Sequence, residues 1–534
     1  MRRGARPASL AEAGKVRDSG PMRRRLILLH PLLFAAYPVL FLFAANAADQ
    51  VTLEPLWLPL GVSVAAAALL TAMLSVLLRD PVRGGLLATL AIGLFFAYGH
   101  VWNLVGTFLG DQWPLIGAWA LLAVLGGVAV WRSGRWGRPT ARTLTVLGAI
   151  AVALNIGSLA AYSLDGTIAA GVSGPVGRVG ATDETPPKRP DIYYIILDRY
   201  AGAQTLAREY GYDNTPFLDE LERRGFYVAD ESDANYIKTP LSLDSSLSMD
   251  YLDADALRAE ATSGKDREPI HRRLRGLLAV PVSLKELGYR YVQISNWWEP
   301  TRDNVDADVV YRYSGQSEFS TALLQTTLLR ALTPDATIQD PWDWGVLREH
   351  TLYELDRLSR MPELPGPKFV FTHLLIPHDP YVFDRDGSFM DRDQVAAQGQ
   401  GESYVRQLEF TNSRILEIID RLLAGSPEDR PIILLQSDEG PFPDRYQADE
   451  WGFEWTDATD AELQEKFRIL NTFYLPGVDP VEAGLYESIS PVNSFRVVFN
   501  AYFGTDLPLL PDRIYAHTDL DHFYDFFEIT DRLN

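Results

Sequence analysis

The first third of the chain consists of long apolar stretches separated by short polar loops. Five of these stretches are close to the roughly 20 residues that an α-helix needs to cross a bilayer, and the fourth is the shortest. The pattern therefore predicts five membrane-spanning helices. They are expected at Leu26–Ala47, Leu56–Leu78, Gly84–Gly106, Pro114–Trp131 and Leu144–Tyr162.

Lys and Arg occupy alternate loops of this apolar region. They precede the first span and follow the second and fourth spans, whereas the loops after the first and third spans contain none. Because loops on the cytoplasmic side carry an excess of Lys and Arg, a cytoplasmic N-terminus is predicted, and five spans place everything after Tyr162 outside. The first apolar run is too long for a typical cleaved signal peptide, and more spans follow it, so a retained anchor is expected. The basic positions are Arg2, Arg3, Arg6, Lys15, Arg17, Arg23, Arg24 and Arg25, then Arg79 and Arg83, then Arg132, Arg135, Arg138 and Arg142.

Two polar side chains, His100 and Asn103, lie inside the third predicted span. Polar groups at this depth must be satisfied within the bundle or by a ligand. The sequence leaves two interpretations open: contact with a lipid headgroup, or pairing between helices.

After residue 190 the pattern changes to short apolar runs that alternate with amphipathic segments. Such alternation predicts an α/β domain with a largely parallel sheet. Continuous apolar runs bounded by charge are typical of strands that are buried on both faces. Strands are expected at Ile192–Leu197, Phe226–Val228, Tyr291–Ile294, Lys368–Thr372 and Pro431–Gln436, and helices at Phe217–Arg224, Val282–Leu287 and Tyr404–Leu423.

Charge supports a division into a membrane part and a water-facing part. Residues 1–164 have a formal net charge of +8 and residues 165–534 one of −29. The acidic part argues against a nucleic-acid partner, which would require clustered Lys and Arg. With no cysteine, the chain has no disulfide, thiolate metal site or cysteine nucleophile. We expect a cytoplasmic basic tail (1–25), a membrane domain (26–164), a linker that includes part of a juxtamembrane helix (165–190) and an extracytoplasmic α/β domain (191–534).

Three buried strands of the predicted sheet lead directly to side chains that can bind a metal. Asp198 follows the first strand, His373 ends another, and Asp438 and Glu439 follow a third. Sites in parallel sheets lie beyond the carboxyl ends of the strands. Carboxylates and histidines gathered there are suited to an oxygen- and nitrogen-ligated cation.

Other candidate residues lie outside these strand ends. Thr239 is expected near the N-terminus of a hydroxyl-rich helix, where the helix dipole stabilises an alkoxide or a phosphate. Lys238 precedes it and is expected to be solvated. His378 follows a Pro turn in the segment Thr372-His-Leu-Leu-Ile-Pro-His-Asp-Pro380, and His517 is a weaker candidate.

Taken in this order, the motifs resemble those of the alkaline-phosphatase/sulfatase superfamily. The likeness extends to its membrane-anchored group, which includes lipoteichoic acid synthases and phosphoethanolamine transferases. It covers residues 190 to about 530 and the five-span topology before them. The resemblance implies an alkaline-phosphatase-like α/β fold, with Asp198 as an acidic metal ligand and Thr239 as a nucleophile that also binds the metal. It also matches Asp438-Glu439-Gly440 to the Asp-His-Gly motif of the family.

The chain departs from this family in two places. It has neither a Cys nor a Ser in the Cys/Ser-x-Pro-x-Arg pattern that formylglycine sulfatases require, so a sulfatase of that kind is not expected. Glu439 stands where the family has His. A carboxylate there shifts metal preference from Zn²⁺ toward Mn²⁺ or Mg²⁺, or else indicates that metal binding has been lost.

The resemblance implies a membrane-bound phosphotransferase that uses one divalent cation (Mn, Mg or Zn), held by Asp198, Thr239, Asp438 and Glu439. Thr239 would attack a phospholipid donor, His378 or His373 would bind the phosphoryl oxygens or protonate the leaving group, and an envelope glycan or polymer would accept the phospho-headgroup. Two alternatives remain: a hydrolase of phosphate or sulfate esters with the same fold, and a non-catalytic envelope binding module. The oligomeric state is not predicted.

Overall fold

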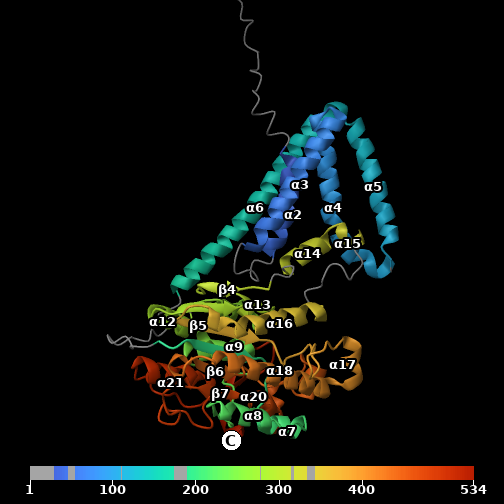
Figure 1. Cartoon of the computed structure of the whole chain (residues 1–534). Coiled ribbons are helices and arrows are strands. Elements are labelled where there is room, and N and C mark those ends of the chain that lie inside the picture. Colours follow the sequence, from blue (N-terminus) through green and yellow to red (C-terminus); the bar gives the residue numbers. More distant parts are fainter. Residues whose placement is uncertain are drawn as a thin grey trace, which may run out of the picture. The chain divides into compact units, whose positions relative to one another are not determined.

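The computed structural model describes residues 29–45, 54–109, 111–172, 189–276, 278–313, 318–332 and 343–533. These residues form two compact units (Figure 1). The first unit contains the apolar helices up to Leu164 together with the segment 318–332, and the second contains the remaining α/β part. The basic tail (1–25) and most of the predicted linker lie outside the described residues.

The helices of the first unit agree with the predicted spans. Four stretches are long and apolar enough to cross a membrane, at Leu56–Leu78, Pro81–Gly106, Trp113–Arg132 and Gly134–Ala160. The first predicted span, Leu26–Ala47, extends beyond the described residues at both ends, and its described part is a helix of 16 residues. The helices are α2 (His30–Ala45), α3 (Glu54–Leu78), α4 (Pro81–Leu109), α5 (Trp113–Arg132) and α6 (Gly137–Val172), with the 3-10 turn η2 (Gly134–Trp136) before α6.

A short segment from the second half of the sequence completes the first unit. It consists of α14 (Glu318–Thr326) and α15 (Leu329–Leu332), and α14 packs against α2, α3 and α4. Phe319 and Leu323 are buried in a cluster with Val39, Leu40 and Phe43. This grouping differs from the predicted boundary, which assigned all of 191–534 to one domain, because the segment is too short to show a membrane-length pattern.

The second unit is built on a seven-stranded sheet with the strand order β2-β7-β6-β1-β5-β3-β4. Strands β6, β1, β5, β3 and β4 run parallel, and β7 is antiparallel to β6. The predicted, largely parallel sheet is confirmed. The strands are β1 (Ile192–Leu197), β2 (Tyr227–Val228), β3 (Arg290–Ile294), β4 (Val309–Tyr311), β5 (Lys368–Leu374), β6 (Ile432–Gln436) and β7 (Asn471–Tyr474), and β8 (Tyr515–His517) pairs separately with β9 (Phe526–Glu528).

Helices cover both faces of this sheet because the central strands are apolar on both sides. In β1, Tyr193, Ile195 and Leu197 join one core cluster, whereas the alternate residues join the other. The first cluster is covered by α7 (Ala203–Glu209), α8 (Thr215–Arg223), α16 (Trp344–Ser359) and α18 (Gln400–Leu422), and the second by α9 (Thr239–Ser248), α12 (Ala279–Glu286) and α21 (Pro491–Phe503).

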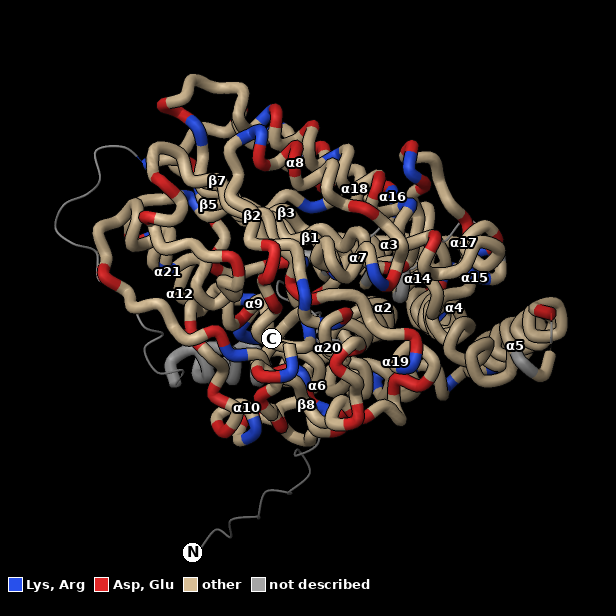
Figure 2. The backbone as a smooth tube through the Cα atoms, turned by 90° about the horizontal axis from the view of Figure 1, so that it is seen from below, with Lys and Arg blue, Asp and Glu red and all other residues tan. Residues whose placement is uncertain are grey.

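The remaining elements are short and lie at the ends of the strands or on the surface. Figure 2 shows acidic and basic positions interspersed over the second unit. The helices are α10 (Ala254–Glu260), α11 (Glu268–Leu274), α13 (Glu299–Arg302), α17 (Arg392–Gln398), α19 (Asp444–Ala448) and α20 (Asp460–Phe467), and the 3-10 turns are η3 (Met361–Glu363), η4 (Pro427–Asp429), η5 (Trp455–Asp457) and η6 (Thr530–Arg532).

Candidate active site

Three strand ends bring two carboxylates and an imidazole together in the second unit. Strand β1 lies between β5 and β6, and Ile196 is in register with both His373 of β5 and Gln436 of β6. Asp198 and Asp438 therefore follow their strands at the same level of the sheet, beside His373. One ligand atom from each of these three buried residues lies within 4.8 Å of the other two.

The atoms that face each other in this cluster have the properties of metal ligands. Asp198 Oδ1, Asp438 Oδ2 and His373 Nε2 are buried and have no hydrogen-bond partner among the described residues. The other ring nitrogen of His373, Nδ1, is 2.9 Å from Thr301 Oγ1, which orients the ring. Nε2 then lies 3.5 Å from Asp198 Oδ2. Buried polar atoms are rarely left unpaired, and metal-bound histidines are held through their second nitrogen, so this donor set fits a divalent cation.

The two carboxylates of the cluster have very different proton affinities. Burial, together with the negative charges of Asp198 and Glu439, raises the pKa of Asp438 to about 7. Burial would also raise the pKa of Asp198, but the nearby His378 and His373 side chains outweigh it and hold that pKa well below its usual range. The Asp198 carboxylate in turn raises the pKa of His373 against the effect of burial. A cation at the cluster would remove the repulsion between the carboxylates.

Thr239 is the first residue of α9, at a helix start as expected from the sequence, and it lies close to Asp438. Its side chain is almost completely buried and close enough to the Asp438 carboxylate to lower the pKa of that group. Every residue of α9 from Thr239 to Leu247 is buried, so the helix is held rigidly against the sheet. The positive end of the helix dipole therefore lies at the Thr239 hydroxyl, where it would stabilise developing negative charge.

Glu439 is held differently from the ligand set that the resemblance implies. Its Oε1 lies 3.0 Å from Lys466 Nζ and 3.4 Å from Arg199 Nε. The Lys466 ammonium also donates to the Gly440 carbonyl at 2.9 Å. Glu439 is outside the group of three residues. Two protein cations compensate its Oε1, whereas its Oε2 is buried without a hydrogen-bond partner among the described residues, so its role as a metal ligand remains a prediction.

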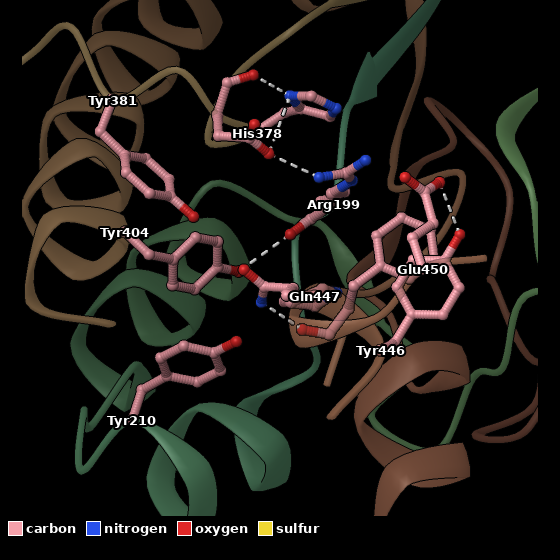
Figure 3. A pocket seen from close by; sticks show the side chains of 11 residues that line it. Arg199, Tyr210, His378, Tyr381, Tyr404, Tyr446, Gln447 and Glu450 are labelled. Atoms are coloured by element: carbon pink, nitrogen blue, oxygen red, sulfur yellow. Dashed lines mark hydrogen bonds and ion pairs between the residues drawn. The ribbon is translucent and has the colours of Figure 1, made fainter. Parts of the chain in front are cut away.

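A pocket of about 250 Å³ lies beside Arg199, the residue that follows Asp198 (Figure 3). Arg199 and His378 line it, and Arg199 Nη1 donates to Asp379 Oδ1 at 2.6 Å. Arg199 has a φ of 58°, a left-handed conformation that is uncommon for a residue other than glycine and that often marks a functional turn. The lining is polar and aromatic: Arg199, Tyr210, His378, Asp379, Tyr381, Tyr404, Pro441, Phe442, Tyr446, Gln447 and Glu450.

Lys238 and His517 are placed away from the ligand atoms. Lys238 is mostly buried, unlike the solvated side chain expected from the sequence, because its Nζ donates to Tyr446 Oη at 2.8 Å and lies 4.0 Å from the centre of the Phe442 ring. His517 is buried in β8 and is not part of the metal-ligand cluster among the described residues.

Sequence reasoning missed Arg199, Lys466 and the tyrosines of the pocket. Arg199 directly follows the predicted ligand Asp198, so its position in the sequence could have identified it as a candidate site residue. Lys466 stands in α20 with no neighbouring motif, and only the folded chain brings it to Glu439.

No family model and no curated protein matches the sequence. The chain is similar to several solved structures at low sequence identity. One is the C-terminal periplasmic domain of EcEptC from Escherichia coli, with 14% identity and a TM-score of 0.43, covering 66% of this chain and 96% of that one. Another is the integral membrane protein lipooligosaccharide phosphoethanolamine transferase A from Neisseria meningitidis, with 13% identity and a TM-score of 0.37, covering 90% of this chain and 95% of that one.

A third is a protein from Vibrio parahaemolyticus with 13% identity and a TM-score of 0.41, covering 65% of this chain and 79% of that one. This structure is described as a member of the alkaline phosphatase superfamily.

Proposed function

We propose that the chain is a membrane-bound phosphotransferase that depends on a divalent cation and uses Thr239 as its nucleophile. The observation that supports this most directly is the buried Thr239 hydroxyl close to Asp438, beside a cluster in which each of the three residues has a buried polar atom without a hydrogen-bond partner among the described residues. Asp198, His373 and Asp438, with the Thr239 oxygen, would hold the cation. When bound, a divalent cation (Mn, Mg or Zn) would stabilise the alkoxide form of Thr239.

The first step forms a bond between Thr239 Oγ1 and the phosphorus of a phospholipid headgroup. The Thr239 proton leaves toward the nearby Asp438 carboxylate. The bond between phosphorus and the diacylglycerol oxygen breaks, and His378, which lines the pocket, protonates that oxygen. The phospho-headgroup is then covalently attached to Thr239.

The second step returns Thr239 to its starting state. A hydroxyl group of an envelope glycan or polymer attacks the phosphorus, and His378 accepts its proton. The bond between phosphorus and Thr239 Oγ1 breaks, and Asp438 returns the proton to that oxygen. The polar lining of the adjoining pocket suits a headgroup or an acceptor with hydroxyl groups better than an acyl chain. If water took the place of the acceptor, the same residues would carry out hydrolysis.

The proposed reaction requires the second unit to face the lipid headgroups on the outer side of a membrane. The alternation of basic and non-basic loops supports a cytoplasmic N-terminus and an extracytoplasmic α/β unit in a plasma-membrane protein.

The ligand set is tested by measuring metal content and turnover in two matched variants. His373→Asn removes a proposed ligand, and we expect the affinity for Mn²⁺ or Zn²⁺ to fall at least about 10- to 100-fold. Glu439→Gln removes a carboxylate paired with Lys466 and Arg199, and we expect metal affinity to change much less. A loss of metal with Glu439→Gln but not with His373→Asn would contradict this ligand set.

The nucleophile is tested separately. The full-length protein is incubated with a phospholipid, and diacylglycerol release and modification of Thr239 are followed. We expect Thr239→Ala to abolish release and a phosphorylated Thr239 to be trapped when no acceptor is present. Turnover by Thr239→Ala would refute the mechanism, and a metal-free protein without turnover would favour the non-catalytic binding module.

A further inference from the structure

The segment 318–332 reaches deep into the apolar helices of the first unit. The Leu328 N–H donates to the Phe95 carbonyl of α4 at 2.7 Å. The apolar stretch of α4 ends at Gly106. At about 1.5 Å per residue, Phe95 lies roughly 16 Å inside that end, about half the thickness of a hydrocarbon core. The turn between α14 and α15 therefore packs against the middle of this apolar stretch.

The polar backbone of this turn is satisfied within the protein. Thr326 Oγ1 and Thr327 Oγ1 donate to the carbonyls of Leu323 and Leu324, each at 2.7 Å. The Leu329 N–H donates to Thr327 Oγ1 at 3.2 Å. Non-helical backbone is tolerated at this depth only where protein groups satisfy it, so these bonds are what a membrane-embedded turn requires.

Because Gly99 of α4 has no side chain, the backbone of the segment 318–332 can lie close to α4. A Cβ atom at Gly99 would lie 2.0 Å from the Gln325 carbonyl oxygen. Any other residue would push α14 away from α4. The segment is also anchored by buried apolar side chains, since Phe319 packs edge-on against Phe43 with ring centres 5.2 Å apart. We call residues 318–332 the re-entrant hairpin.

The re-entrant hairpin carries an arginine without a counter-charge. Arg330 Nη1 donates to Asn103 Oδ1 at 2.8 Å. Within the described ranges no carboxylate forms an ion pair with Arg330. Asn103 lies three residues before Gly106, so this pair is about 5 Å inside the end of the apolar stretch, near the level of lipid headgroups. The pair is exposed, so the guanidinium is accessible to an anion at this level.

We propose that Arg330 and Asn103 form a binding site for the phosphate group of a phospholipid, created by insertion of the re-entrant hairpin into the helical unit. The planar guanidinium can donate two parallel hydrogen bonds to phosphate oxygens, and the Asn103 amide can donate another. The membrane depth of the hairpin selects a lipid phosphate over phosphate in solution. The site does not depend on chemistry at Thr239.

The test measures lipid binding by the full-length protein in detergent, in a Thr239→Ala background that excludes turnover. The probe is dioctanoyl phosphatidylglycerol, and the phosphate-free comparison is dioctanoylglycerol. We expect Arg330→Gln to weaken binding of the phospholipid at least about tenfold, as expected for loss of a charge-assisted hydrogen bond, and to leave binding of dioctanoylglycerol unchanged. Arg330→Lys should restore part of the affinity, because it keeps the charge but not the planar fork.

Arg135→Gln is the matched control, because Arg135 lies in the turn between α5 and α6, beside Trp136. We expect it to bind phospholipid as the parent does. If Arg330→Gln does not fold, Asn103→Ala provides the same comparison with a smaller change. Equal phospholipid binding by Arg330→Gln and its parent would overturn the proposal. So would displacement of the lipid by excess inorganic phosphate, because the site would then recognise phosphate in solution.

Discussion

The buried ion pair between Lys466 and Glu439 allows a quantitative test of how the candidate site is built. Both side chains are almost fully buried, and Lys466 Nζ lies 3.0 Å from Glu439 Oε1. The Lys466→Met substitution keeps a long side chain against the Phe442 ring but removes the charge. Among the described residues it would leave Glu439 with Arg199, at 3.4 Å, as its ion-pair partner.

The expected cost follows from this geometry. At 3.0 Å and an effective dielectric constant of about 20, two unit charges attract by about 5–6 kcal/mol. Breaking a buried pair by removing one partner typically costs about 3–5 kcal/mol, because the remaining charge stays buried. Because Arg199 still compensates part of the Glu439 charge, we expect a loss near the lower end, about 3 kcal/mol.

The assay is denaturant-induced unfolding of the full-length protein in detergent, followed by tryptophan fluorescence. Lys265→Met is the matched control, because Lys265 pairs with Asp521 at 2.7 Å in an exposed position. We expect it to cost at most about 1 kcal/mol. Adding Glu439→Gln to Lys466→Met should recover a large part of the loss, since no buried charge then remains unpaired.

Two results would refute this reasoning. One is a cost for Lys466→Met no larger than that for Lys265→Met. The other is a double variant that loses as much stability as the two single variants together, because independent effects would mean that the two charges do not interact.

Three further predictions concern metal binding and close backbone contacts. Burial and neighbouring carboxylates raise the pKa of Asp438 to about 7, so protons compete with the cation for this carboxylate below that pH. Metal affinity measured by titration should therefore fall up to about tenfold for each pH unit below 7. A metal affinity that does not change with pH would contradict this. A Cβ at Gly440 would lie 2.2 Å from a backbone carbonyl oxygen, so Gly440→Ala should lower the free energy of unfolding by about 1–3 kcal/mol in the same assay. A Cβ at Gly425 would make only an ordinary contact, so Gly425→Ala should lower the free energy of unfolding much less. Gly99→Ala should expose the re-entrant hairpin to proteolysis in the full-length protein, whereas Gly93→Ala, which meets no atom within 4 Å, should not.

The cluster of candidate metal ligands at the strand ends could be predicted because its signal is local. Asp198, His373 and Asp438 each end or follow a continuous apolar run, and parallel strands place such positions at one edge of a sheet. Thr239 could be placed at a helix start from its own surroundings in the chain. The positions of these residues could be predicted from the parallel arrangement of the strands, without knowing how particular side chains pack.

The charged partners of Glu439 could not be predicted in the same way. Its neighbours in the sequence suggest a metal ligand, but its charge is balanced by Lys466 from a separate helix and by Arg199. A long-range ion pair leaves no periodic pattern in the sequence. The partner of a buried charge depends on which elements the fold packs against it.

Hydrophobic periodicity by itself determined the apolar helices, the central strands and the strand-end position of the site, because each depends on short stretches of chain that interact with lipid or with the protein core as a whole. Tertiary structure decided how the charges are paired and where the re-entrant hairpin belongs. Residues 318–332 are too short to show a membrane signal, and only the packing of Phe319 and Leu323 against α2, α3 and α4 assigns them to the helical unit. Local patterns specify which side chains must be buried, whereas their partners follow from the three-dimensional arrangement of the chain.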